Sequence, residues 1–171
     1  MLKWFDENIE KSIILVCYVA MTAIIFVEVI RRFAFGLQAP WSSTIPIYLF
    51  LWVTWIGCAY NCKQRSHLRF DEFRMRLPRR GQFFCLMLDH VIWIGFSILI
   101  IYFAMEQVKV ARDNFAIVQG TDDVLQWWFY MATPIGFSLI IYRVLQNLME
   151  DIRRFRCGEP LLSNTSDKVV D

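Results

Sequence analysis

The sequence predicts an all-α membrane protein with four transmembrane helices, and three observations support this fold class. First, 57% of the 171 residues are hydrophobic and 16% are aromatic, whereas about 45–50% apolar residues are usual in a soluble domain. Second, four stretches of sixteen to thirty residues contain no Asp, Glu, Lys or Arg. Third, the charged residues gather between these stretches, where a membrane protein has its loops.

The first span is expected at residues 12–33. A helix rises about 1.5 Å per residue and the hydrocarbon layer is about 30 Å thick, so about twenty residues suffice to cross it. Ahead of this span, residues 1–11 place Leu2, Phe5 and Ile9 on one helical face, opposite several charges. This pattern predicts a short interfacial helix at the N-terminus.

The second span is expected at residues 41–62, the last part of a run of thirty uncharged residues. Gly36 and Pro40 divide this run and predict a turn ahead of the helix. Pro46 falls early in the helix, where the missing N–H is best tolerated.

The third and fourth spans are expected at residues 82–110 and 124–148. Residues 90–105 of the third span and residues 124–142 of the fourth lack formal charge. Thr121-Asp122-Asp123 is a start signal for the last helix, because small acceptor side chains cap free N–H groups. Pro134-Ile135-Gly136 predicts a kink.

The distribution of Lys and Arg predicts that both termini lie in the cytoplasm. With four spans, fourteen of the eighteen Lys and Arg residues fall on the side of the termini and of the basic stretch 63–80. Basic residues near helix ends stay on the cytoplasmic side of the membrane. We expect four of them to contact lipid headgroups: Arg79, Arg80, Arg153 and Arg154. We expect residues 1–158 to form a single domain and residues 159–171 a disordered cytoplasmic tail, since the tail has little to bury.

No residue pattern predicts an enzyme, a cofactor site, a metal site or a nucleic-acid surface. His67 and Asp71 are four residues apart, but zinc usually requires about four donors, so orienting the basic stretch is the favoured interpretation. A haem held by His67 and His90 is an alternative, although both lie outside the expected membrane core. Cys58 and Cys62 share a helical face, and the absence of cysteines from the outer loops argues against a disulfide-generating enzyme.

Glu28 shares a helical face with Arg31 and Arg32 near the outer end of the first span. An intramembrane carboxylate could couple transport to protons, and this gives one functional hypothesis: a self-sufficient four-helix proton-coupled carrier that uses Glu28. The two adjacent arginines should keep Glu28 ionised. The favoured interpretation is therefore a local ion pair or an anchor for a partner.

Four segments, taken in order along the chain, resemble the motifs of a known membrane-protein family. They are VEVIRRFAFG (27–36) followed by Trp41, LFLWVTWIGCAYNCKQRSHLRFD (49–71), Leu77-Pro78, and WWFYMATPIG (127–136). Together they resemble the small four-helix (Q) subunit of tripartite ATP-independent periplasmic (TRAP) transporters. One departure is notable. Ser42-Ser43-Thr44 stand where the family usually has an acidic residue after the tryptophan, so the contacts of that carboxylate are not expected here.

The resemblance implies a partner role in the bacterial inner membrane, as a multi-pass subunit that is not an enzyme and has no cofactor. In such transporters a periplasmic binding protein captures an organic acid, such as a C4-dicarboxylate, a sialic acid or another sugar acid. A large elevator-type membrane subunit then imports it with the sodium gradient. The small subunit packs on the static scaffold of the large one and helps to dock the binding protein.

The resemblance also implies roles for particular residues. Eight are expected to anchor the partner or the membrane interface: Glu28, Arg31, Arg32, Trp41, Trp52, Gly57, His67 and Asp71. Three at the outer side are candidate contacts of the binding protein: Arg112, Asp113 and Trp127. The sequence does not tell which acid is transported.

Overall fold

The computed structural model describes residues 2–64, 76–121 and 123–158, with side chains from Glu10 onward. Its helices are α1 (Leu2–Phe35), α2 (Trp41–Gln64), α4 (Arg79–Asp113), α5 (Trp127–Tyr130) and α6 (Ala132–Cys157). Four helical stretches are long and apolar enough to cross a membrane: Glu10–Phe35, Trp41–Gln64, Arg79–Asp113 and Trp127–Cys157. The predicted fold class, an all-α protein with four transmembrane helices, is confirmed.

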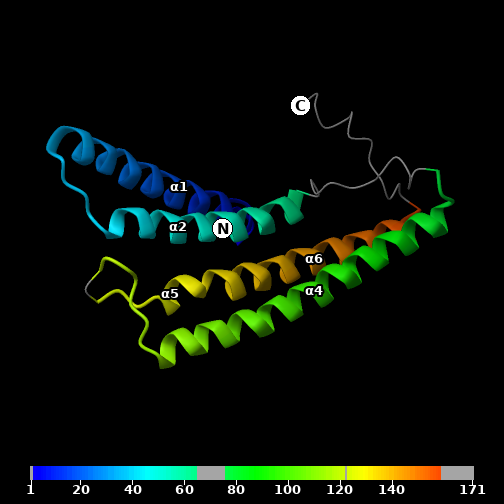
Figure 1. The fold of residues 1–171 in the computed structure, drawn as a ribbon. Helices are drawn as coiled ribbons and strands as arrows, with labels where there is room; N and C mark the ends of the chain where they lie inside the picture. Colours follow the sequence, from blue (N-terminus) through cyan, green and yellow to red (C-terminus); the bar gives the residue numbers. More distant parts are fainter. Residues whose placement is uncertain (1, 65–75, 122, 159–171) are drawn as a thin grey trace.

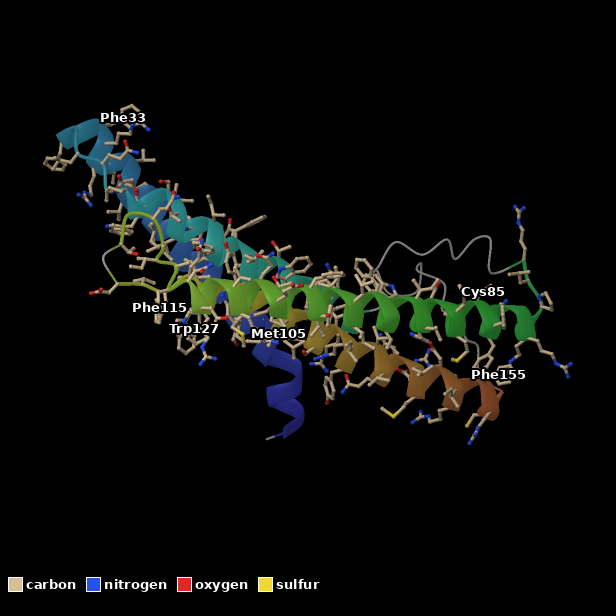
Figure 2. All side chains as sticks on the ribbon, turned by 60° about the horizontal axis from the view of Figure 1, so that its bottom comes forward. Phe33, Cys85, Met105, Phe115, Trp127 and Phe155 are labelled. Carbon is tan, nitrogen blue, oxygen red and sulfur yellow. The ribbon has the colours of Figure 1, made fainter. Side chains whose placement is uncertain are left out.

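The helices lie in a row rather than in a closed bundle (Figure 1). Helix α1 packs on α2, α2 packs on α6, and α6 packs on α4. We call the end where α1 and α4 start the basic end, and the opposite end the loop end. Figure 2 shows Cys85 and Phe155 at the basic end and Phe33, Phe115 and Trp127 at the loop end. Helix α6, which packs against both α2 and α4, is the central element of the fold.

Helix α1 contacts the rest of the chain through a single stripe. Its less exposed side chains include a series that recurs at alternating spacings of four and three: Glu10, Ile14, Cys17, Met21, Ile24, Glu28 and Arg31. This spacing keeps one face of a helix against a neighbour. Most of the remaining apolar side chains of α1, such as Val16, Phe26 and Phe33, are exposed on the surface of the chain. The membrane or a partner must therefore cover most of this helix.

Helices α2 and α6 approach each other closely at Gly136. A Cβ atom at Gly136 would lie 2.4 Å from the Cβ atom of Trp55, so no larger residue fits without a shift of the helices. Small residues at such positions allow close packing of transmembrane helices. Next to this contact lies a buried apolar cluster of Ala59, Cys62, Phe137, Ile140 and Val144.

The predicted start of the last helix at residues 121–123 is wrong, and Asp122 lies outside the described residues. The Thr121 hydroxyl donates to the Val118 carbonyl oxygen at 2.7 Å and so closes a turn. The chain then folds back as a short hairpin, in which the Val118 N–H donates to the Val124 carbonyl at 2.8 Å. Because these residues bond across the hairpin, helix α5 begins only at Trp127.

The expected interruption of the last helix lies at Met131, between α5 and α6. Pro134 has no N–H, and its ring crowds the carbonyl of the residue four positions earlier, Tyr130. The break therefore falls one turn ahead of the proline that causes it.

Helix α1 runs without a break from Leu2 to Phe35. The expected N-terminal interfacial segment thus belongs to the same helix as the first span, and its place in the headgroup region stays a prediction. The expected tail at residues 159–171 lies outside the described residues, as do His67 and Asp71.

Candidate functional site: a buried polar ladder on the last helix

Three polar side chains of α6 lie at successive spacings of four residues, on one face of the helix. They are Arg143, Asn147 and Asp151, and all three are buried. Residues four apart on a helix are neighbours on its surface. Each of the three bonds to a different helix, and we call this set the polar ladder.

Arg143 connects α6 to α1. Its Nε donates to the Glu10 Oε1 at 2.8 Å, and the exposed fractions of the two side chains are 3% and 1%. Its Nη1 also donates to the Gln146 side chain, at 2.8 Å. The other carboxylate oxygen of Glu10 is buried and has no hydrogen-bond partner among the described residues. Loss of one partner from such a pair costs about 3–5 kcal/mol, because the other charge stays buried and uncompensated.

Asn147 connects α6 to the last turns of α2. Its side-chain N–H donates to the Cys62 carbonyl oxygen at 2.9 Å. Cys62 lies in the last turn of α2, which the structure describes up to Gln64. Asn147 therefore ties the buried face of α6 to the backbone of α2 near that end.

Asp151 connects α6 to α4. Its Oδ2 lies 3.0 Å from the Nε2 of His90, and the exposed fractions of the histidine and aspartate side chains are 7% and 0%. At the same end of the molecule, the Arg79 guanidinium of α4 donates to the Arg154 and Phe155 carbonyls that end α6. Helices α4 and α6 are thus joined by two polar contacts at the basic end.

The ladder was not predicted from the sequence. Of its residues and their side-chain partners, only His90 was singled out, as an alternative haem ligand outside the expected membrane core. The spacing of four between Arg143, Asn147 and Asp151 was a signal that could have revealed a polar stripe. It did not indicate which helices the stripe would contact.

At the loop end, Glu28 closes the turn between α1 and α2. Its Oε1 accepts the backbone N–H of Ala39 at 2.8 Å, and its Oε2 lies 3.9 Å from the Nη1 of Arg31. The Ser42 hydroxyl donates to the Ala39 carbonyl at 2.6 Å. Both side chains therefore fix the path of the turn.

The other residues singled out from the sequence are spread over the surface of the row. Trp52 is half-buried. Apart from the chain neighbours of Gly57 and the adjoining backbone of its own helix, no atom of the described residues lies within 4 Å of where a Cβ would stand at Gly57. Arg32, Trp41, Arg112 and Asp113 are exposed at the loop end. Trp127 is half-buried and stacks on Trp128, with 4.4 Å between the ring centroids.

At the basic end, Arg80 and Arg153 are exposed, and Arg154 pairs with Glu150. Their expected contacts with partners and lipids stay predictions.

No three or more His, Cys, Asp or Glu side chains in the described part of the chain are grouped so that they could hold a metal ion. The predicted pairing of His67 with Asp71 cannot be placed, because it lies outside the described residues. His90 directs a ring nitrogen at Asp151. The ladder therefore holds helices together and presents no open set of ligands.

Comparison with known proteins identifies the family. The family model of tripartite ATP-independent periplasmic transporters, DctQ component, matches residues 21–154. The chain belongs to this family. It is therefore a transporter subunit of the bacterial inner membrane and not an enzyme. This result confirms the resemblance read from the four segments.

Several curated proteins are similar to this DctQ-family chain. The isethionate TRAP transporter permease protein DctMQ of Oleidesulfovibrio alaskensis is 24% identical over 89% of this chain, which spans only 25% of that relative. The C4-dicarboxylate TRAP transporter small permease protein DctQ of Vibrio cholerae is 23% identical over 83% of this chain and 70% of the relative. The sialic acid TRAP transporter small permease protein SiaQ of Vibrio cholerae is 22% identical, with 86% and 84% covered.

Proposed function

We propose that this chain is the small membrane subunit of a sodium-driven, binding-protein-dependent importer of an organic acid. In this proposal it packs on the static part of a large elevator-type membrane subunit, which carries the substrate. It also contributes to docking of the periplasmic binding protein. Both termini and the basic end face the cytoplasm, and the loop end faces the periplasm.

The polar ladder is the observation that carries the proposed supporting role. Arg143, Asn147 and Asp151 are buried, and each connects α6 to another helix. A carrier needs intramembrane polar groups that face a cavity, where ions and substrate can reach them. The ladder groups instead bond to neighbouring helices, as expected for a rigid support.

The fused relative supports the partnership with a large subunit. In the DctMQ permease, the region similar to this chain makes up a quarter of a much longer polypeptide. Fusion gives two segments a high effective concentration for each other, which favours their assembly when they function as one complex. By analogy, this chain would assemble with a separate large subunit.

The exposed apolar surface of the four-helix row is consistent with contact to a partner protein or lipid on most sides. Many large apolar side chains of α1 and α4 are exposed, among them Val16, Phe26, Val91 and Phe103. Contiguous apolar surface of this extent requires a membrane or a protein partner. We propose that Trp52, Gly57 and the outer arginines lie where the large subunit meets this surface.

The competing hypothesis, a self-sufficient carrier with Glu28 as its proton site, receives less support. Glu28 accepts a backbone N–H from Ala39 and lies near the Arg31 guanidinium. Both contacts tie the carboxylate to the turn between α1 and α2. A proton carrier needs a carboxylate that faces a pathway for ions, whereas Glu28 serves to close this turn.

Reconstitution tests the proposed function. Proteoliposomes containing this chain alone should accumulate none of isethionate, a C4-dicarboxylate or sialic acid, the acids in the names of the relatives. Vesicles that also contain the large subunit, with its binding protein outside and an inward sodium gradient, should accumulate one organic acid. Uptake by this chain alone would contradict the proposal.

A further inference from the structure

Phe115 occupies a backbone position that normally requires glycine. It follows the C-cap residue of α4, Asn114, and has a φ of +48°. Its N–H donates to the Arg112 carbonyl at 3.1 Å, and the N–H of Ala116 donates to the Ala111 carbonyl at 3.0 Å. This pair of bonds ends many helices, and the residue in the left-handed region is usually glycine. Helix α1 has glycine just after its end, where Gly36 has a φ of +64°.

The side chain of Phe115 does not compensate for this strain inside the chain. It is 76% exposed, although it is a large aromatic residue. Strained backbone positions occupied by bulky residues cluster at functional sites, because the surrounding structure must over-determine them. Both the strain and the exposure therefore need an explanation outside this chain.

The hairpin that carries Phe115 is firmly supported. Gly120 packs against the backbone of Pro40 and Trp41, where an added Cβ would lie 2.5 Å from main-chain atoms. Val118 is fully buried, and Gln126 donates from its side chain to the Tyr48 hydroxyl. The hairpin also exposes Ile117 and Val124. We call Phe115, Ile117 and Val124, three exposed apolar residues of this supported hairpin, the loop-end platform.

The position of the platform favours a water-soluble partner over lipid. The apolar part of α4 ends at Met105, and the eight residues 106–113 that follow contain four charges. Eight helical residues span about 12 Å, so the charged end of α4 separates Phe115 from the apolar span. Exposed charged and polar residues, namely Arg112, Asp113, Asn114 and Asp123, adjoin the platform in the sequence. An apolar centre with a polar rim is typical of a protein interface.

We propose that Phe115 is the apolar anchor on which the periplasmic binding protein docks, with its ring inserted into a shallow apolar depression of that protein. This inference rests on the proposed docking role of the small subunit. It makes Phe115 the central contact of the binding protein, in place of the candidate contacts Arg112, Asp113 and Trp127. The supported hairpin fixes the direction of the Cα–Cβ bond of Phe115, so little backbone freedom is lost on binding.

The experiment separates strain from contact by comparing Phe115→Gly with Phe115→Ala. Glycine removes the ring and accepts the positive φ without strain, whereas alanine removes the ring and keeps the strain. The complex of small and large subunits is placed in nanodiscs, and the affinity of the purified binding protein of the same transporter is measured. Both variants should weaken binding at least tenfold, as expected for an aromatic hot spot. Only Phe115→Gly should match or exceed the parent in thermal stability.

Two controls make each outcome decisive. Phe84→Ala removes a similarly exposed ring from α4 near the basic end and should leave docking unchanged. The large subunit without this chain gives the baseline: equal binding there would refute the proposed docking role itself. If the small subunit is required but Phe115→Gly binds like the parent, only the assignment to Phe115 is overturned. A photo-crosslinker at position 115 that captures lipid instead of the binding protein would also overturn it.

Discussion

The Nε of Arg143 and the Oε1 of Glu10 lie 2.8 Å apart, although 133 positions separate the two residues in the sequence. The contact joins the first transmembrane helix to the last, and these two helices are not backbone neighbours in the row. It therefore fixes where α1 crosses towards α6 at the basic end. At the loop end, Glu28 fixes the other end of α1 through the turn to α2. Two carboxylates thus hold the ends of a helix whose remaining contacts are mostly apolar.

Breaking this pair should destabilise the chain strongly. Arg143→Leu leaves the Glu10 carboxylate buried without its cation, and we expect the free energy of unfolding to fall by about 3–5 kcal/mol. Unfolding in mixed detergent micelles measures this change. The double variant Glu10→Leu/Arg143→Leu should recover much of the loss, because apolar replacement of a buried pair is often close to neutral.

Arg153→Leu is the matched control for Arg143→Leu, because Arg153 is an exposed arginine of the same helix. Its effect should stay within about 0.5 kcal/mol, the range of ordinary surface substitutions. Equal stabilities of Arg143→Leu and Arg153→Leu would show that the pair does not hold α1.

The sequence could predict that the helices exist, because uncharged runs of this length occur where a chain crosses a membrane. It could not predict the order of the row. Glu10 lies just before the expected first span and Arg143 lies in the expected fourth, and only the arrangement of the helices makes them partners. Phe115 shows a different limit. Glycine is the sequence signal for a left-handed residue after a helix, and a phenylalanine at that position gives no such signal.

Glu28→Gln distinguishes the supporting subunit from a proton carrier. The amide oxygen of glutamine can still accept the Ala39 N–H, but the side chain can no longer take up a proton. We expect sodium-driven uptake by the assembled transporter to stay within about twofold of the parent, since the hydrogen bond is kept. Glu28→Leu removes the acceptor and should lower the thermal stability of the small subunit. Abolished uptake in a stable, fully assembled Glu28→Gln transporter would instead favour the proton carrier.

Gly136 and Gly57 should respond to the same substitution in different ways. At Gly136 an added side chain meets Trp55, with 2.4 Å between the Cβ atoms, so Gly136→Leu should separate α2 from α6 and cost at least about 1–3 kcal/mol of stability. At Gly57 an added Cβ meets no other helix among the described residues within 4 Å. Gly57→Leu should therefore leave the isolated subunit as stable as the parent.

The predicted contact between Gly57 and the large subunit can be tested separately. If the large subunit packs closely at this glycine, Gly57→Leu should reduce co-purification of the two subunits in mild detergent, because small residues allow helices to approach. Thr54→Ala, one turn away on the same helix, serves as a control for a mild change of the same surface. Unchanged co-purification of the Gly57→Leu variant would place the partner elsewhere.

Cysteine accessibility tests the orientation on which the docking proposal depends. Cys157 is exposed at the basic end, whereas Cys17, Cys58, Cys62 and Cys85 are buried or half-buried within the helices. Because basic residues remain on the cytoplasmic side, a membrane-impermeant maleimide should label Cys157 only after spheroplasts are permeabilised. Asn114→Cys, at the exposed end of α4, should be labelled in intact spheroplasts. Labelling of Cys157 from outside would reverse the orientation and place the loop-end platform in the cytoplasm, out of reach of any periplasmic protein.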